Sequence, residues 1–247
     1  MRNFAEQSLD IARHIFDRWL GAFGEDGTII GERGQPSRRD DAGYFAHALA
    51  VCAALLGQRK LPQGDLVNAA AQCIATQFYY AADCLEGCAH AAMALLTLGV
   101  NRSRNPAWEQ FPESIRGSIS RWMRIHQRHT ESEKFFAIIR CVAAFSMGFV
   151  DSDESDKKIE NYLNDLVRSS SGGFVNTAAE EGNGRYDASG LERLLLMREL
   201  LQRHAIVYVR ERRLPALRSC MQKYLRMFPM LIQGDGSSWN YGEPAGC

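Results

Sequence analysis

The sequence predicts an all-α protein, arranged as an (α/α) toroid of helical hairpins, and three observations support this. Apolar residues recur with the i, i+3, i+4 and i+7 spacing of helices along most of the chain, and no segment alternates convincingly as a strand. Helices with one charged face alternate with helices that are apolar nearly all round. The apolar helices begin roughly 45 to 55 residues apart, a period typical of stacked hairpins. An open solenoid of the same hairpins is the alternative arrangement.

The predicted helices follow one another with short and long loops between them. They are expected near residues 3–23, 41–57, 63–80, 86–99, 112–128, 131–148, 153–170, 188–212 and 214–232. The amphipathic helices would form an outer ring. The apolar helices, rich in small residues that allow close approach, would form an inner ring. The segment IVYV at 206–209 is the best strand candidate, but Arg and Glu on both sides favour a helix. The long loops 24–40 and 171–187 enter inner helices, which would place them at the mouth of a toroid.

Composition limits the classes of function. The chain has 247 residues, 46% of them hydrophobic, which is enough for a sizeable core, and we expect a single domain over 1–247. The formal net charge is zero, so no overall field would recruit nucleic acid or an anionic membrane. No segment approaches the roughly 20 apolar residues of a membrane span, and no secretory leader is visible. Most of the seven cysteines lie in apolar helical segments, which indicates free thiols and a cytoplasmic protein.

The stretch GGFVNTAAEEGNGRYDASGLERLLL, residues 172–196, carries the densest group of candidate site residues. Asp187 is placed to cap the helix that follows, and Arg185 is available to lower the pKa of Tyr186. Tyr186 would then serve as a general acid or base, or as a stacking surface for a sugar. We therefore predict Tyr186 and Asp187 as catalytic residues and Asn176 and Arg185 as substrate-binding residues. A solvated loop with helix caps is the alternative.

Two further segments resemble this loop in composition. Asp40 and Asp41 precede Tyr44 at a helix start; one aspartate would cap the helix and the other would face the cleft with Tyr44. The loop GDGSSWNYGEP offers Asp235, Trp239 and Tyr241, and aromatic rings on a polar loop suit stacking on a sugar. Asp41, Tyr44, Asp235, Trp239 and Tyr241 are accordingly predicted to bind substrate.

The sequence contains no clear motif for binding a metal ion or a cofactor. Cys84 and Cys88 share a helix face, but His90 lies about 160° further round from Cys88, so one continuous helix cannot make all three converge. No P-loop, dinucleotide fingerprint, nucleophile elbow or zinc-protease helix occurs. We expect no metal and no cofactor.

The alternation of amphipathic helix, glycine-rich loop and apolar helix resembles the (α/α) toroid carbohydrate-active proteins, which include heparinase-like polysaccharide lyases and toroidal glycoside hydrolases. The loops 172–196 and 231–244 look like theirs, although Glu243 stands where the related pattern carries Arg. Such toroids are usually longer, so we expect a partial barrel or a native chain that extends beyond Cys247.

The resemblance implies a protein that binds or cleaves an oligosaccharide, with an acidic one favoured and with hydrolysis and elimination both open. One alternative is a non-catalytic helical-repeat module that binds a protein or peptide. A further alternative is a terpenoid-cyclase-like or metal-dependent toroid enzyme. Carboxylates and aromatic rings gathered at one end of the helices would favour an enzyme, whereas contacts spread along a groove would favour a scaffold.

Overall fold

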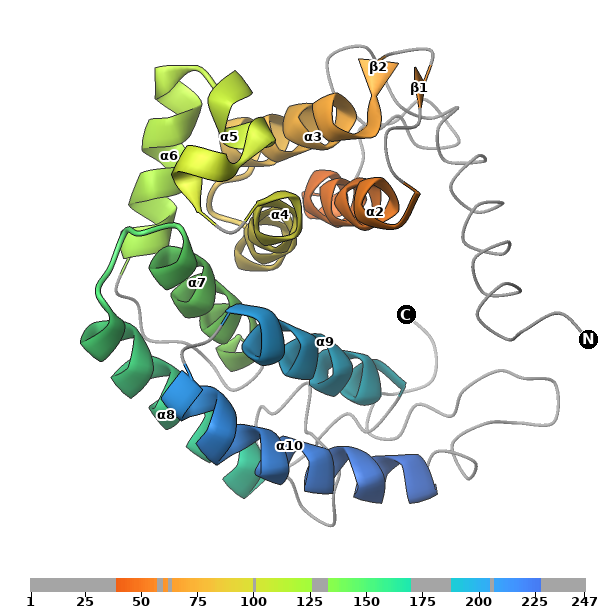
Figure 1. Cartoon of the computed structure of the whole chain (residues 1–247), viewed down its shortest axis with the longest axis vertical. Helices are drawn as coiled ribbons and strands as arrows, with labels where there is room; N and C mark the ends of the chain where they lie inside the picture. The colour runs from red at the N-terminus through yellow and green to blue at the C-terminus, as the bar shows by residue number, and fades with distance from the viewer. Residues whose placement is uncertain are drawn as a thin grey trace, which may run out of the picture. The chain divides into compact units, whose positions relative to one another are not determined.

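The computed structural model describes residues 39–56, 60–61, 64–99, 101–125, 133–169, 188–204 and 207–227, and these residues are predominantly helical (Figure 1). The prediction of an all-α fold is confirmed. The helices are α2 (Asp41–Leu56), α3 (Leu66–Tyr80), α4 (Leu85–Leu98), α5 (Pro106–Gln110), α6 (Glu113–Arg124), α7 (Lys134–Ser146), α8 (Ser152–Ser169), α9 (Ala188–His204) and α10 (Val207–Met227), with a 3₁₀ turn η1 at Arg102–Arg104. The strands found there are β1 (Lys60–Leu61) and β2 (Gly64–Asp65), a two-residue antiparallel pair.

The described residues form two compact units. Unit 1 contains α2 to α5 and α6 up to Arg116, and unit 2 contains η1, the rest of α6 and α7 to α10. The expectation of a single domain over the whole chain stays a prediction.

In unit 1, helices α2, α3 and α4 pack against one another (Figure 1). The Asp65 carboxylate caps α3 by accepting the Asn68 backbone N–H at 2.8 Å. Every residue of α4 from Gly87 to Leu96 is buried, as the apolar composition of this helix predicted. The crossing of α2 and α4 is close because both helices place glycine there: a Cβ on Gly43 would overlap the backbone of Gly87.

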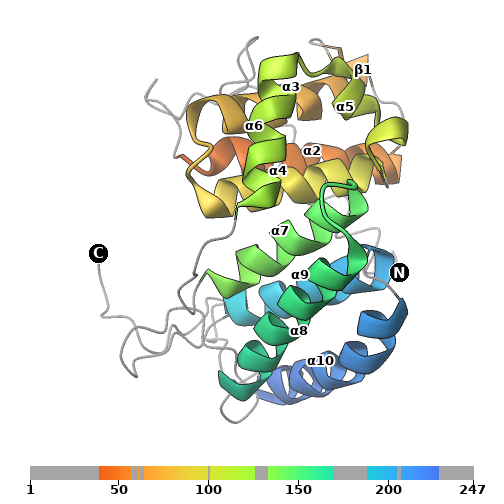
Figure 2. The same cartoon turned by 90° about the vertical axis from the view of Figure 1, so that its left-hand side faces the viewer.

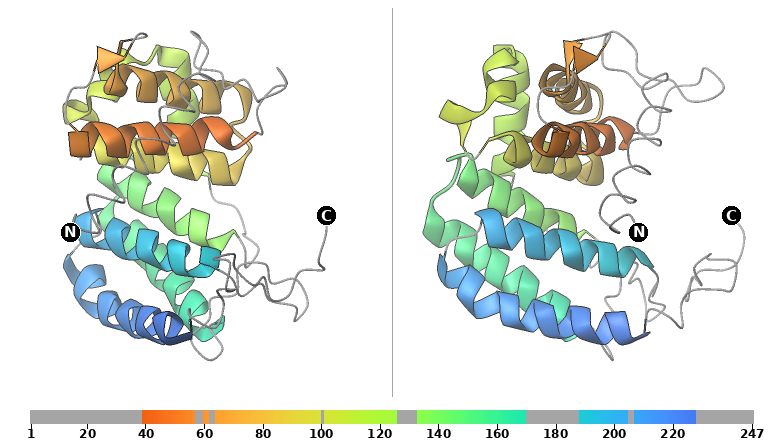
Figure 3. Two further views of the ribbon diagram at one scale, coloured as in Figure 1. Left: turned by 90° about the vertical axis from the view of Figure 1, so that its right-hand side faces the viewer. Right: turned by 45° about the vertical axis from the view of Figure 1, so that its right-hand side comes forward.

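In unit 2, α7 packs against α8 and α9, and α10 packs against α8 and α9 (Figures 2 and 3). Every residue of α7 from Phe135 to Ala144 is buried, including Arg140. In contrast, α8 buries one face through Ser155, Ile159 and Leu163. The two kinds of helix predicted from the apolar pattern, one buried all round and one amphipathic, therefore both occur.

Several boundaries differ from the predicted ones. We expected one helix over 188–212 and the next from Leu214; this boundary is wrong, because α9 ends at His204 and α10 runs from Val207 through Pro215. The short helix α5 was not predicted, since five residues are too few to show a helical period. The helix expected over 3–23 and the loop 171–187 lie outside the described residues. No helix among those that the structure describes combines the length and apolar character needed to cross a membrane.

Candidate functional site

Three helix ends meet at one end of unit 1, which we call the hairpin end and define as residues 39–47 and 77–90. Gln77, buried at 1% exposure, ties these ends together. Its Oε1 accepts the Gly43 backbone N–H at 3.0 Å, and its Nε2 donates to the carbonyl oxygens of Arg39 at 3.0 Å and Ala81 at 3.1 Å. A buried amide with these bonds holds the start of α2 against the end of α3.

The close crossing of α2 and α4 brings two polar side chains into contact. The Tyr44 hydroxyl of α2 donates a hydrogen bond to the Glu86 carboxylate of α4. The Tyr44 ring also stacks on His90 of α4, with 3.9 Å between ring centroids and an interplanar angle of 29°. Tyr44 is 40% exposed, whereas His90 is 4% exposed, so Tyr44 covers the histidine and presents its own outer surface to solvent.

His90, on which Tyr44 stacks, is paired with His47 of α2. The Nδ1 atoms of His47 and His90 are 3.4 Å apart, a distance at which one ring donates and the other accepts. The ring that accepts must be unprotonated at Nδ1. Burial lowers the pKa of His47 from 6.5 to about 4, because an imidazolium there would lose its hydration. At neutral pH His47 is uncharged and can act as a hydrogen-bond acceptor or donor.

The surface of the hairpin end carries further charged and aromatic groups. Arg39 forms an exposed ion pair with Asp83, and its hydrogen bond lowers the pKa of the Asp83 carboxyl. Tyr79 and Tyr80, in the last turn of α3, are each 69% exposed and meet edge to face with 4.7 Å between centroids. Asp40 and Asp41 stand at the start of α2. This end of unit 1 therefore combines carboxylates, one guanidinium and exposed aromatic rings.

The cysteines of this region are not arranged to hold a metal. The Cys88 thiol is buried and donates to the carbonyl oxygens of Ala81 at 3.4 Å and Ala82 at 3.6 Å, and burial raises its pKa. A neutral thiol that bonds to the preceding turn is a structural group. Across the described ranges, no group of three or more His, Cys, Asp or Glu side chains is placed to bind a metal ion.

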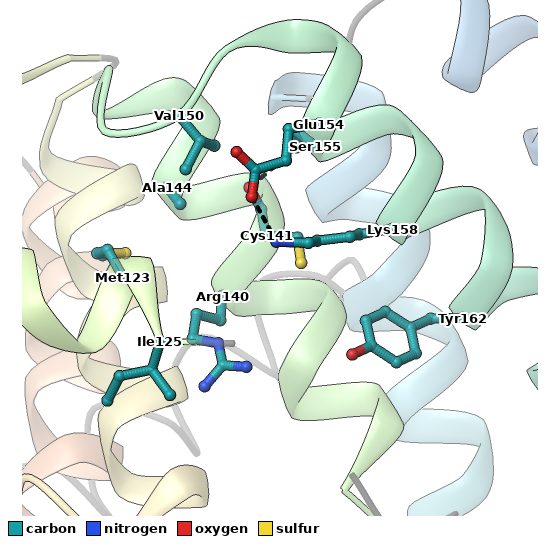
Figure 4. Close-up of a pocket in the computed structure, with 10 residues that line it drawn as sticks. All are labelled: Met123, Ile125, Arg140, Cys141, Ala144, Val150, Glu154, Ser155, Lys158 and Tyr162. Carbon is teal, nitrogen blue, oxygen red and sulfur yellow. Dashed lines mark hydrogen bonds and ion pairs between the residues drawn. The ribbon is translucent and has the colours of Figure 1, made fainter. Parts of the chain in front are cut away.

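Unit 2 contains a separate pocket of about 270 Å³ between α7, α8 and the end of α6 (Figure 4). Figure 4 shows the Tyr162 hydroxyl turned toward the Arg140 guanidinium, with the Glu154–Lys158 ion pair across the pocket. The pocket is lined by Met123, Ile125, Arg140, Cys141, Ala144, Val150, Glu154, Ser155, Lys158 and Tyr162. None of these residues was predicted as a site residue.

Of the predicted site residues, the structure places Asp41 and Tyr44, and both lie at the hairpin end. The others lie outside the described residues: Asn176, Arg185, Tyr186, Asp187, Asp235, Trp239 and Tyr241. Sequence reasoning missed Glu86 as a partner of Tyr44. The sequence contained one indication of a polar site at Glu86. Glu86 and His90 are four residues apart, which puts both side chains on one face of α4. For the pocket, the indication was Arg140, the one charged residue inside the apolar segment FFAIIRCVAAF, because a buried charge is costly without a partner or a role.

No protein-family model, no curated protein and no solved structure matches this chain.

Proposed function

We propose that this chain is a protein of the (α/α) toroid kind that binds an oligosaccharide at the hairpin end of unit 1. The observation that carries the proposal is the gathering of carboxylates and exposed aromatic rings at one end of α2, α3 and α4. The alternation of fully buried helices, α4 and α7, with the amphipathic helix α8 supports the toroid part of the proposal.

The groups at the hairpin end suit the two faces of a sugar. The C–H face of a pyranose is apolar and stacks on exposed aromatic rings, which Tyr79 and Tyr80 provide. The hydroxyl groups of a sugar need hydrogen-bond partners, and Glu86 can accept from them beside its bond from Tyr44. The stacked His90 and the Gln77 bonds hold Tyr44 and the start of α2 in place, so less conformational entropy would be lost on binding.

The charge at the hairpin end bears on the class of sugar. Asp40, Asp41, Asp83 and Glu86 supply four carboxylates against the single guanidinium of Arg39, which is already paired with Asp83. Like charges repel, so this balance favours a neutral oligosaccharide over the acidic one expected from the sequence. Cleavage of the sugar, with Tyr186 and Asp187 in the catalytic roles, remains part of the proposal.

The test is a thermal-shift and calorimetric titration of the full chain with neutral oligosaccharides, such as cello- and chito-tetraose, beside tetragalacturonate. We expect a neutral sugar to stabilise the fold, because a ligand stabilises the state that binds it. Tyr44→Phe and Glu86→Gln should each weaken binding about tenfold, the effect of removing one hydrogen bond to a charged group.

Glu109→Gln is the matched control, since Glu109 is an exposed glutamate of α5 in the same unit. It should leave binding unchanged. Absence of saturable binding by every sugar, or an equal loss with Glu109→Gln, would reject the hairpin end as a glycan site. A parallel titration of the Tyr186→Phe, Asp187→Asn double variant tests the contribution of the loop 171–187.

A second function, binding of a peptide or protein, is favoured by one observation. Val51 and Leu55 lie four residues apart on α2 and are 37% and 68% exposed, which leaves an apolar strip away from the hairpin end. If this strip is the binding surface, Leu55→Lys will abolish binding of a protein partner, while Glu86→Gln will not affect it.

A further inference from the structure

The pocket in unit 2 has an arginine in an unusual setting. Arg140 is 4% exposed and lies in the middle of α7, whose other buried residues are apolar except for Cys141. Its guanidinium lies 5.7 Å from the centre of the Trp122 ring, a cation–π distance that helps to hold the side chain in one position. Because an arginine is costly to bury, its place at the wall of a cavity indicates a role there.

Three charged side chains line the pocket, two cations and one anion. Lys158 is paired with Glu154, four residues earlier on α8, so these two charges offset each other. Arg140 is the second cation of the lining, and the Glu133 carboxylate, which does not line the pocket, also interacts with it electrostatically. Burial raises the pKa values of Cys141 and Tyr162, so both are neutral at pH 7. Tyr162 therefore adds a hydroxyl donor and no negative charge.

The remaining walls and the volume set the size of a ligand. Met123, Ile125, Ala144 and Val150 are apolar and line the pocket together with the charged groups. A volume of about 270 Å³ lies just below the range of roughly 300–1,000 Å³ found for small-molecule sites. A ligand that uses both kinds of wall has one anionic group and a short apolar body.

We propose that this pocket binds a small organic carboxylate, with the carboxylate against the Arg140 guanidinium and the Tyr162 hydroxyl, and the apolar body against Met123, Ile125 and Val150. A guanidinium fork matches a carboxylate in geometry and forms charge-assisted hydrogen bonds with it. The pocket lies wholly within unit 2 and is independent of the glycan site proposed for unit 1.

The experiment is calorimetric titration of the full chain with hexanoate and benzoate, the neutral analogues hexanamide and benzamide, and inorganic phosphate. We expect at least one carboxylate to bind saturably, and its amide to bind more than about tenfold more weakly, because only the carboxylate pairs with the guanidinium. Phosphate, which has no apolar body, should bind more weakly than the carboxylate. Equal binding of carboxylate and amide, tighter binding of phosphate, or no saturable binding would overturn the proposal.

Variants then locate the site. Arg140→Met should weaken carboxylate binding more than about tenfold, the loss of a charge-assisted pair. Val150→Trp keeps Arg140 and fills the cavity, so it should also abolish binding, and it provides the test if Arg140→Met does not fold. Lys157→Gln, an exposed neighbour on α8 that does not line the pocket, is the control and should bind as the unchanged protein does. An equal loss in Lys157→Gln, or full binding by Val150→Trp, would place the carboxylate elsewhere.

Discussion

At the residue scale, the surroundings of His47 determine its protonation state and its hydrogen bonding. Its Nδ1 lies 3.4 Å from that of His90, and the two rings are 5.6 Å apart between centroids. At this distance one ring donates its Nδ1 proton and the other accepts it. Burial lowers the pKa of His47 to about 4 and keeps its ring neutral at pH 7.

This arrangement predicts a loss of stability in acid. The pKa of His47 is about 4 in the folded chain against 6.5 as its ordinary value, so the unfolded chain takes up the proton first as pH falls. The free energy of unfolding should therefore decrease from about pH 6.5 down to about pH 4, by up to about 3 kcal/mol from this group. Urea unfolding at several pH values measures the decrease.

The variant His47→Gln isolates the contribution of His47 from those of the carboxylates. It should lower the slope of unfolding free energy against pH between 4 and 6.5, whereas Tyr44→Phe, in the same cluster, should keep the slope of the unchanged protein. An identical slope in His47→Gln would show that His47 titrates normally.

At the element scale, the crossing of α2 and α4 depends on two glycines. A Cβ on Gly43 would overlap the carbonyl group of Gly87, and backbone atoms cannot move aside as a flexible side chain can. Gly117 in α6 is the opposite case, because a Cβ there would meet nothing within 4 Å.

Replacement by alanine should have opposite effects on stability at Gly43 and at Gly117. Gly43→Ala should destabilise the protein by about 1–3 kcal/mol or more through overpacking. Gly117→Ala should stabilise it by about 0.5–1 kcal/mol, because alanine restricts the unfolded chain and favours the helix. Urea unfolding of the two variants measures both effects. A neutral Gly43→Ala would mean that α2 and α4 do not cross closely.

Helix boundaries were less predictable than the helices themselves. The sequence predicted a helix start at residue 214, directly before Pro215, a residue that disfavours a helix interior. The structure instead runs α10 from Val207 to Met227, and Leu217, Met221 and Tyr224 keep one buried face after the proline. Burying that face in the tertiary structure stabilises the helix by more than proline costs locally. The local sequence pattern does not show this, because it does not include the tertiary contacts.

At the scale of the whole molecule, the thiols report on both units. Among the described cysteines, Cys73 and Cys88 of unit 1 and Cys141 and Cys220 of unit 2 are buried, whereas Cys52 and Cys84 are partly exposed. Burial also raises the pKa values of Cys73, Cys88 and Cys141, so little reactive thiolate is present. In the native protein, iodoacetamide should label Cys52 and Cys84 and spare the four buried thiols.

Labelling across a urea gradient, followed by peptide mapping, tests the single-domain prediction. If 1–247 unfolds cooperatively, the four buried thiols will become reactive at one urea concentration. Separate midpoints for the unit 1 and unit 2 pairs would show two independently unfolding domains. Rapid labelling of Cys73 without urea would instead contradict the burial of α3.

The amino-acid sequence alone predicts the all-α class, the positions of most helices and the fully apolar character of α4 and α7, because the period of apolar residues is a local property of a helix. It also identified Asp41 and Tyr44 as residues at a helix start. The packing of the helices, by contrast, brings Tyr44 to Glu86, 42 residues away, and places Arg140 in the wall of a pocket with Tyr162. Both depend on how helices cross, and a helical period specifies which face is buried without specifying which helix buries it.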